Sequence, residues 1–237
     1  MAWSCTVDQD LPSYESNARL KRTLLYGDVE AINPIAIVDE YEYDNLNRIS
    51  KVSSPLYNNG TIVGTGKFEL YRYDAQGKLI EIEGYNANTN SPTGFINLTN
   101  QKFFYSSIGL KEREIIEYPQ INAAENILFF YSGNHLSKTE RYQANGQMAE
   151  YSLFEYQGSR MVKETSFTPT GELNRITEYK LQKDGSELEV IYAGPGKIKV
   201  REVKRTFDAN RNLLMLQSIE LAAWSSTMSF VMRYEYY

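Results

Sequence analysis

The sequence predicts an all-β protein: an antiparallel up-and-down meander of hairpins that closes into a wide soluble barrel of roughly 14–16 strands. An open single-layer sheet is the alternative. Three observations favour this class. Turn signals recur evenly along the 237 residues, the runs between them alternate with period two, and aromatic residues make up 13% of the chain, led by 19 Tyr. Tyr suits strands whose faces are half exposed to water.

The turn signals set the order of the elements. Three copies share one pattern, in Tyr41–Ile49, Tyr71–Ile80 and Phe207–Leu213. The looser copies are Ser107–Gly109, Gly133–Asn134, Asn145–Gly146, Gly158, Thr170–Gly171 and Asp184–Gly185. Gly, Asn and Asp tolerate the positive φ that hairpin turns need. Each signal therefore predicts the end of one strand and the beginning of the next.

Between the turns, side chains alternate between two faces. Arg19–Tyr26 is predicted as the first strand rather than a helix, because it begins the series of hairpins. The residues predicted to share one face of the last strand are Met228, Phe230, Met232, Tyr234 and Tyr236. Residues 57–66 and 86–94 are rich in Asn, Gly, Thr, Ser and Pro, so we predict longer hairpin connections there.

Several strands carry charges on both faces. Lys111–Tyr118 reads Lys-Glu-Arg-Glu-Ile-Ile-Glu-Tyr, and Lys197–Lys204 has one mostly basic face. A β-sandwich needs one apolar face on each strand, so these strands favour a sheet wetted on both sides. A membrane barrel needs apolar outward positions, which the same charges contradict. A closed soluble barrel also removes exposed strand edges, and the aromatic C-terminal strand is predicted to be either its closing strand or an edge strand.

The Tyr71–Leu79 core resembles the YD repeat of the RHS family of bacterial surface and toxin-encapsulating proteins. As a whole, Arg19–Tyr237 is similar to a family of short bacterial lipoproteins of unknown function, built from degenerate YD-like hairpins. That resemblance implies a porin-like barrel fold and no established catalytic residues. In the degenerate copies, Ser106, Ser132 and Gln157 stand where the repeat has Asp.

The N-terminal segment differs from the rest of the chain. Residues 1–18 contain Asp8, Asp10 and Glu15 but no Lys or Arg, so they carry three of the five net negative charges. We interpret 1–18 as a tether and 19–237 as a single β-meander or barrel domain. Cys5, after small residues, resembles the lipid-attachment Cys of bacterial lipoproteins. Asp8 and Asp10 resemble the acidic export tag of surface lipoproteins in Gram-negative anaerobes; the alternative is an intracellular protein with an incidental Cys.

Catalytic motifs are sparse. His135 is the sole His and Cys5 the sole Cys; we expect the first to lie in a solvated turn and the second in the tether, both poor places for catalysis. Asp208, Asn210 and Asn212 match the opening of a calcium loop that then fails at Leu213 and Ile219. We therefore predict no catalytic residue, no metal and no cofactor.

The leading hypothesis is a non-catalytic lipoprotein of the cell envelope, at the outer-membrane surface or its periplasmic face. It touches the membrane only through its lipid anchor and binds an unknown glycan or envelope protein; the net charge of −5 argues against nucleic acid. A glycan hydrolase using paired carboxylates and a purely structural envelope component are the alternatives. Two roles are open for one group of tyrosines: stacking on sugars, or stabilising the sheet as cross-strand pairs, which we favour. The group is Tyr41, Tyr43, Tyr71, Tyr73, Tyr234, Tyr236 and Tyr237.

We expect Cys5 of the protein isolated from its native envelope to carry a lipid. Mass spectrometry of the N-terminal peptide measures this directly, because each acyl chain adds a defined mass. An unmodified Cys5 thiol would defeat the anchoring hypothesis.

Overall fold

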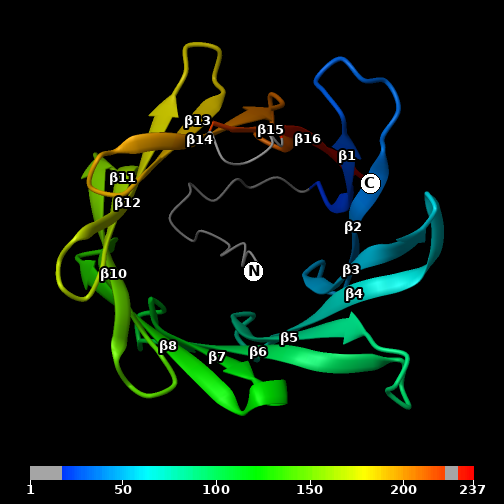
Figure 1. Ribbon diagram of the computed structural model, residues 1–237, viewed down its shortest axis with the longest axis horizontal. Helices are drawn as coiled ribbons and strands as arrows, with labels where there is room; N and C mark the ends of the chain where they lie inside the picture. Colours follow the sequence, from blue (N-terminus) through cyan, green and yellow to red (C-terminus); the bar gives the residue numbers. More distant parts are fainter. Residues whose placement is uncertain (1–17, 222–228) are drawn as a thin grey trace.

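A computed structural model describes residues 18–221 and 229–237, and these residues form one closed antiparallel barrel (Figure 1). Its strands are β1 (Leu20–Tyr26), β2 (Ala36–Tyr43), β3 (Ile49–Asn58), β4 (Thr61–Tyr73), β5 (Leu79–Ala87), β6 (Phe95–Tyr105), β7 (Lys111–Tyr118), β8 (Ala123–Ser132), β9 (His135–Tyr142), β10 (Met148–Gln157), β11 (Arg160–Phe167), β12 (Leu173–Leu181), β13 (Glu187–Ala193), β14 (Ile198–Phe207), β15 (Leu213–Glu220) and β16 (Phe230–Tyr236). A short 3₁₀ helix, η1 (Pro119–Ile121), joins β7 to β8. Within the described ranges, no helix is long and apolar enough to cross a membrane.

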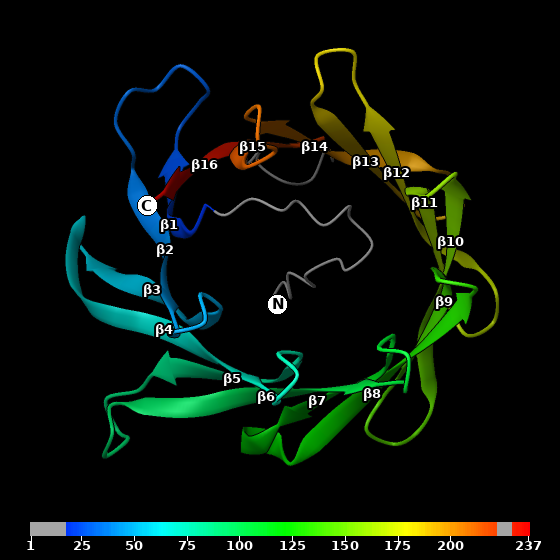
Figure 2. The ribbon, with the colours of Figure 1, turned by 180° about the vertical axis from the view of Figure 1, so that it is seen from behind.

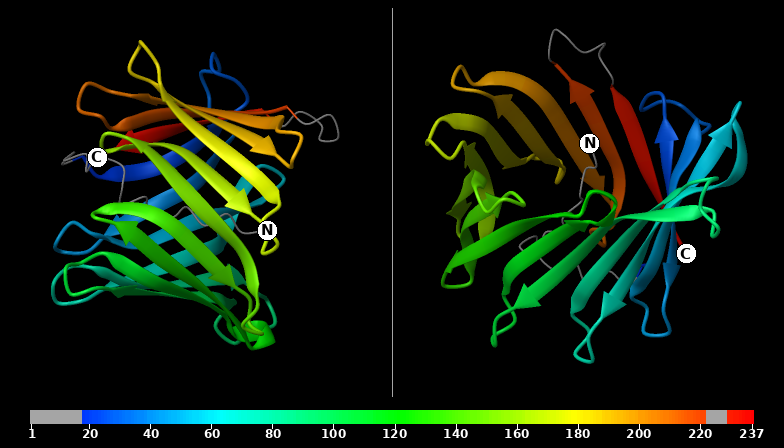
Figure 3. Two further views of the ribbon diagram at one scale, coloured as in Figure 1. Left: turned by 90° about the vertical axis from the view of Figure 1, so that its left-hand side faces the viewer. Right: turned by 60° about the horizontal axis from the view of Figure 1, so that its bottom comes forward.

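Each strand pairs with its neighbours in the sequence, and β16 closes the ring by pairing with β1. Figure 2 shows the ring from behind, and Figure 3 shows the strands running obliquely along the wall. The predicted closed meander is therefore confirmed, and the open-sheet alternative is wrong. Closure gives every described strand two hydrogen-bonded neighbours, so none is left as an exposed edge.

One loop prediction is wrong. Residues 57–66 do not form a long connection, because β3 continues to Asn58 and β4 begins at Thr61. Asn59 and Gly60 make a two-residue turn with φ of 49° and 79°, the geometry that an Asn-Gly pair favours. The polar residues on either side lie within strands. The expected longer connection near 86–94 is present between β5 and β6.

Five-residue turns of one geometry recur around the barrel. The first residue's N–H donates to the carbonyl of the fifth at 2.8–2.9 Å, and the fourth residue's N–H donates to the carbonyl of the first. The fourth residue always has a positive φ, between 62° and 91°. The turns begin at Asp44, Asp74, Ser106, Gln143, Thr168, Gln182 and Asp208.

The side chain of the first residue caps this turn. Asp74 Oδ1 accepts hydrogen bonds from the N–H groups of Gln76 and Lys78 at 2.9 and 2.8 Å, and Asp44 and Asp208 do the same in their turns. The Ser106 and Thr168 hydroxyls each accept one bond, from the fifth residue. A short side chain with an oxygen acceptor satisfies turn N–H groups that the strands leave unpaired.

Where the first residue is Gln, the capping acceptor moves to the third position. Asn145 Oδ1 and Asp184 Oδ1 accept from the N–H groups of Gln147 and Ser186 at 2.9 and 3.0 Å. Ser132 and Gln157, expected where the repeat has Asp, do not begin a five-residue turn, because each directly precedes a two-residue turn. Ser106 does begin one.

A Tyr at or next to the end of a strand ties that end to the start of the preceding strand. Tyr73 at the end of β4 donates its hydroxyl to the carbonyl of Ile49 at the start of β3, at 2.9 Å. The equivalent bonds join Tyr43 to Leu20, Tyr105 to Leu79, Tyr131 to Lys111 and Tyr236 to Leu213. Each bond fastens a strand end at the same rim of the barrel.

Buried apolar side chains gather at the closing seam. Leu24 and Tyr26 of β1 pack with Val231 of β16, all 7% exposed or less, and Ala31 and Met215 lie against them. The Arg233 guanidinium lies 4.2 Å from the ring centroid of Tyr26 and donates to the carbonyl of Val29 at 2.8 Å. The residue 27–35 connection is thus fastened over the pairing that closes the barrel.

Gly77→Ala should destabilise the protein by about 1–2 kcal/mol, because residue 77 has φ +83°. A Cβ at this position meets only the Arg48 guanidinium at 3.8 Å, so the loss comes from backbone conformation. Gly64→Ala is the matched control: it lacks a positive φ and has open space around it, so it should be neutral or slightly stabilising. If urea unfolding showed the same loss of stability for Gly77→Ala and Gly64→Ala, the turn assignment would be contradicted.

Candidate functional site

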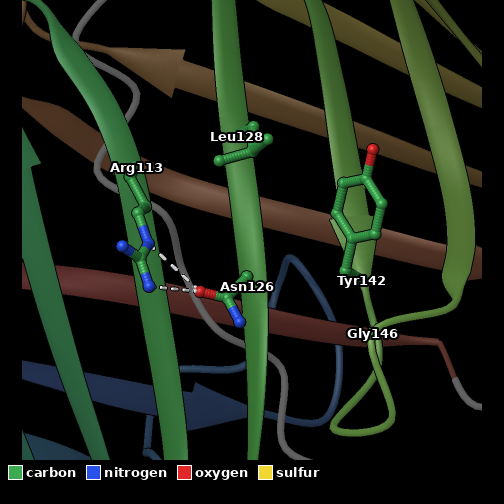
Figure 4. Close-up of a pocket in the computed structure, with 5 residues that line it drawn as sticks. All are labelled: Arg113, Asn126, Leu128, Tyr142 and Gly146. Carbon is green, nitrogen blue, oxygen red and sulfur yellow. Dashed lines mark hydrogen bonds between the residues drawn. The ribbon is translucent and has the colours of Figure 1, made fainter.

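Strand alternation assigns every described strand residue to the inner or outer face of the wall. Figure 4 views β7, β8 and β9 from outside, with the opposite wall behind them, and Arg113, Leu128 and Tyr142 lie on the outward face. Their chain neighbours Glu114 and Arg141 therefore face inward. Because directly opposed residues share a face, the register carries this assignment around the barrel.

The inward face carries a connected polar network over β8–β12. Arg141 contacts Glu125 at 2.5 Å and Glu150 at 3.7 Å. Glu150 also accepts from the Ser166 hydroxyl and the Asn174 amide at 3.3 and 3.4 Å. Further along, Arg205 pairs with Glu189 at 2.7 Å and Arg201 with Glu220 at 3.1 Å. Inward carboxylates are thus held by cations on neighbouring strands.

The inward network remains open to solvent. The side chains of Arg141 and Arg175 are 41% and 45% exposed. A barrel whose centre was filled by a packed core would bury them. The inner surface is therefore wet along this part of the wall.

The outward face also carries ion pairs. Arg72 of β4 contacts Glu81 and Glu83 of β5 at 3.3 and 3.0 Å. The other outward pairs are Arg22–Glu235, Lys51–Glu42, Lys102–Glu117, Lys163–Glu155 and Lys180–Glu178. The prediction of charges on both faces is confirmed. Arg or Lys facing lipid near the bilayer midplane would each cost about 2–4 kcal/mol, so this wall suits water.

The predicted site residues are dispersed. Cys5 lies outside the described residues. His135 is exposed and begins β9 directly after the Gly133–Asn134 turn, where its ring lies 4.7 Å from that of Tyr156. The Asp208 carboxylate accepts bonds from its own turn, including the Asn212 side-chain amide at 2.7 Å. These bonds hold the pKa of Asp208 below its ordinary value, as expected for a turn cap.

Most of the candidate sugar-stacking tyrosines contact protein groups instead. Tyr43, Tyr73 and Tyr236 hold strand ends through their hydroxyls, and the Arg48 guanidinium lies 4.4 Å from the ring centroid of Tyr73. Tyr71 donates to Glu69 at 2.8 Å, and its burial raises the phenol pKa. These contacts favour the structural role for these rings.

A hollow of about 330 Å³ opens on the outer wall and is lined by Arg113, Asn126, Leu128, Tyr142 and Gly146 (Figure 4). Arg113 donates to Asn126 Oδ1 from Nε at 3.1 Å and from Nη2 at 2.8 Å. Register places Arg113 opposite Leu128 and Asn126 opposite Tyr142. Three adjacent strands and the next turn therefore build the hollow.

Glu140 holds the Tyr142 side of the hollow. Its carboxylate accepts a hydrogen bond from the Tyr142 hydroxyl at 2.7 Å and forms an ion pair with Lys138 at 2.6 Å. Lys138 and Tyr142 hold the pKa of Glu140 below its ordinary value. The same hydrogen bond raises the pKa of Tyr142, so the phenol stays protonated and donates at neutral pH.

Sequence reasoning missed this hollow. Period two does place Arg113 and Ile115 of β7 on one face. The pairing of β7, β8 and β9 brings Arg113 beside Asn126 and Tyr142. The bulge between Met148 and Glu150 shifts the register of the neighbouring β9–β10 pair. No single-strand pattern contains that information.

No family model matches the chain, and no curated protein matches it. Among solved structures it is similar to a porin-like protein from Bacteroides uniformis, with a TM-score of 0.46 and 7% identity over 92% of this chain and 96% of that chain. A porin-like protein from Bacteroides vulgatus has a TM-score of 0.28 and 8% identity over 93% and 99%. A TcdB2–TccC3 structure has a TM-score of 0.36 and 14% identity over 80% of this chain and 12% of that chain.

Glu140→Gln should lower stability by about 1 kcal/mol at pH 7, because it removes the charged partner of Lys138 and Tyr142. Since the folded pKa of Glu140 is lowered, its contribution is present above the ordinary value of 4.5 and is lost as the pH falls through the folded value. The difference in the free energy of unfolding between wild type and variant, measured by urea unfolding, should therefore become smaller below pH 4.5. Glu155→Gln, at a 59% exposed carboxylate, is the control. A pH-independent gap would contradict this reasoning.

Proposed function

We propose that this protein is a non-catalytic binding scaffold of the bacterial cell envelope, attached to a membrane by a lipid on Cys5. Its barrel stays in the aqueous phase beside the membrane and presents its wall to a glycan or an envelope protein. The segment before the barrel, with its acidic residues, is the tether in this proposal.

The observation that carries the proposal is the charge on both faces of the same wall. Outward pairs such as Arg72–Glu83 and inward pairs such as Arg205–Glu189 lie on strands of one closed sheet. A lipid-facing wall must be apolar outside, and a β-sandwich must be apolar on one side. A single wall that is hydrated on both sides serves as a large surface, held rigid by its closed ladder.

The carboxylates of the described residues support a non-catalytic role. A glycoside hydrolase keeps one carboxylic acid protonated by raising its pKa. Among the described carboxyl groups, the pKa values that depart from the ordinary range all lie below it, those of Asp44, Glu140, Asp184 and Asp208. Many other acids of the described residues are ion-paired with Lys or Arg across strands.

Detergent phase separation tests the anchoring and the hydrated wall together. Protein isolated from its native envelope should partition into the detergent phase, and the Cys5→Ser variant produced in the same host should partition into the aqueous phase. Ser4→Ala is the matched control and should leave partitioning unchanged. Cys5→Ser protein that stays in the detergent phase would mean that the barrel itself contacts lipid, and the proposal would fail.

A further inference from the structure

Arg113 differs from most arginines of the barrel. The arginines within 4.0 Å of a carboxylate are Arg22, Arg48, Arg72, Arg141, Arg175, Arg201, Arg205 and Arg211. In the described ranges, no carboxylate lies that close to the guanidinium of Arg113. It is exposed, and it is held by the Asn126 amide oxygen and by the Phe104 ring, whose centroid lies 5.4 Å away.

The positioning of Arg113 is tight although its charge is uncompensated. Two hydrogen bonds to one amide oxygen fix the guanidinium plane. A guanidinium has five N–H donors, and these bonds use two of them. The remaining donors and the positive charge are available on an open surface, which is the arrangement that recognises a carboxylate with two parallel hydrogen bonds.

The rest of the hollow supplies the surfaces that a sugar ring needs. Tyr142 offers an aromatic ring on an outward strand position, and its hydroxyl is fixed by Glu140. Leu128 adds apolar surface between Arg113 and Tyr142 (Figure 4). Gly146 leaves the turn side open, since a Cβ there would meet no atom within 4 Å. Aromatic rings pack against the C–H faces of pyranoses, and flanking amides bond their hydroxyls.

We propose that this hollow is a binding site for an acidic sugar, a uronic acid residue of a polysaccharide. The sugar carboxylate pairs with Arg113, the pyranose ring lies on Tyr142, and the Asn126 amide N–H donates to a ring hydroxyl. The backbones of β7 and β9 lie two strand spacings apart, roughly 10 Å, which one sugar ring with its carboxylate can span. The site would supply ligand recognition for the proposed scaffold.

The positive charge of Arg113 and the shape of the hollow distinguish three kinds of ligand: a neutral sugar, an acidic peptide and an acidic sugar. A neutral sugar would leave the Arg113 charge without a partner. An acidic peptide would satisfy Arg113 but would not use the flat ring of Tyr142 and the open turn at Gly146. An anionic pyranose uses all three features, so the uronic acid is the ligand that the observations favour.

Titration calorimetry of the full-length protein with glucuronate and digalacturonate tests the proposal, with glucose, acetate and hexaglutamate as comparison ligands. We expect the uronates to bind, and glucose and acetate to bind at least tenfold more weakly. Arg113→Ala should weaken uronate binding by tenfold or more, and Tyr142→Ala should weaken it while Tyr142→Phe retains most of it. The matched control is Arg72→Ala, an outward arginine already paired with Glu81 and Glu83.

Thermal unfolding of each variant separates lost binding from lost folding, and Tyr142→Phe and Arg113→Lys provide conservative changes if an alanine variant is unstable. The proposal is overturned if uronates do not bind, if glucose or acetate binds as tightly, if hexaglutamate binds more tightly, or if Arg72→Ala matches Arg113→Ala. None of these results depends on Cys5. Detergent partitioning therefore tests the anchor separately from this site.

Discussion

The structure depends on closing the backbone hydrogen-bond ladder between the first and last strands. Among the described residues, the buried apolar side chains are few: Leu24, Tyr26, Ile176, Val190, Val203 and Val231. Such a set cannot hold a sheet of this length through a core. The ladder pairs backbone groups all the way round, and half of these buried side chains lie at the β1–β16 seam. Stabilisation is therefore concentrated where the ring could open.

The capped turns and the tyrosines that fasten strand ends both set the register of the strands. A strand wetted on both faces has little apolar contact to set its register. The capped five-residue turn sets the register within a hairpin, and the hydroxyl of the preceding Tyr fixes its strand end to the strand before it, as Tyr73 does with Ile49. Cation–ring contacts such as Arg48 over Tyr73 cover the rings. Register is thus set at the strand ends, and the wall between them is free to carry charges.

That freedom explains where function can lie. On most of the wall, cations and carboxylates neutralise each other across strands, as Arg205 and Glu189 do. Arg113 departs from this rule, and it lies beside an aromatic ring and an open turn. Asn126 and the Phe104 ring hold Arg113 in place, and among the described residues no carboxylate lies within 4.0 Å of its guanidinium. The outer hollow is therefore the surface that we propose for recognition.

The sequence by itself determined the class of fold, because period-two alternation and turn chemistry are local. Asp74 and Gly77 mark their turn through their own backbone preferences, and the charges of Lys111–Tyr118 already showed that both faces are wet. The sequence around Asn59–Gly60 predicts a long loop because its flanking residues are polar, whereas pairing of β3 with β4 extends through those residues and leaves a two-residue turn. Only the tertiary structure decided the strand register, the closure at β1–β16 and the meeting of Arg113, Asn126 and Tyr142. These contacts join residues on different strands, and their alignment is set by pairing and bulges that no single strand encodes.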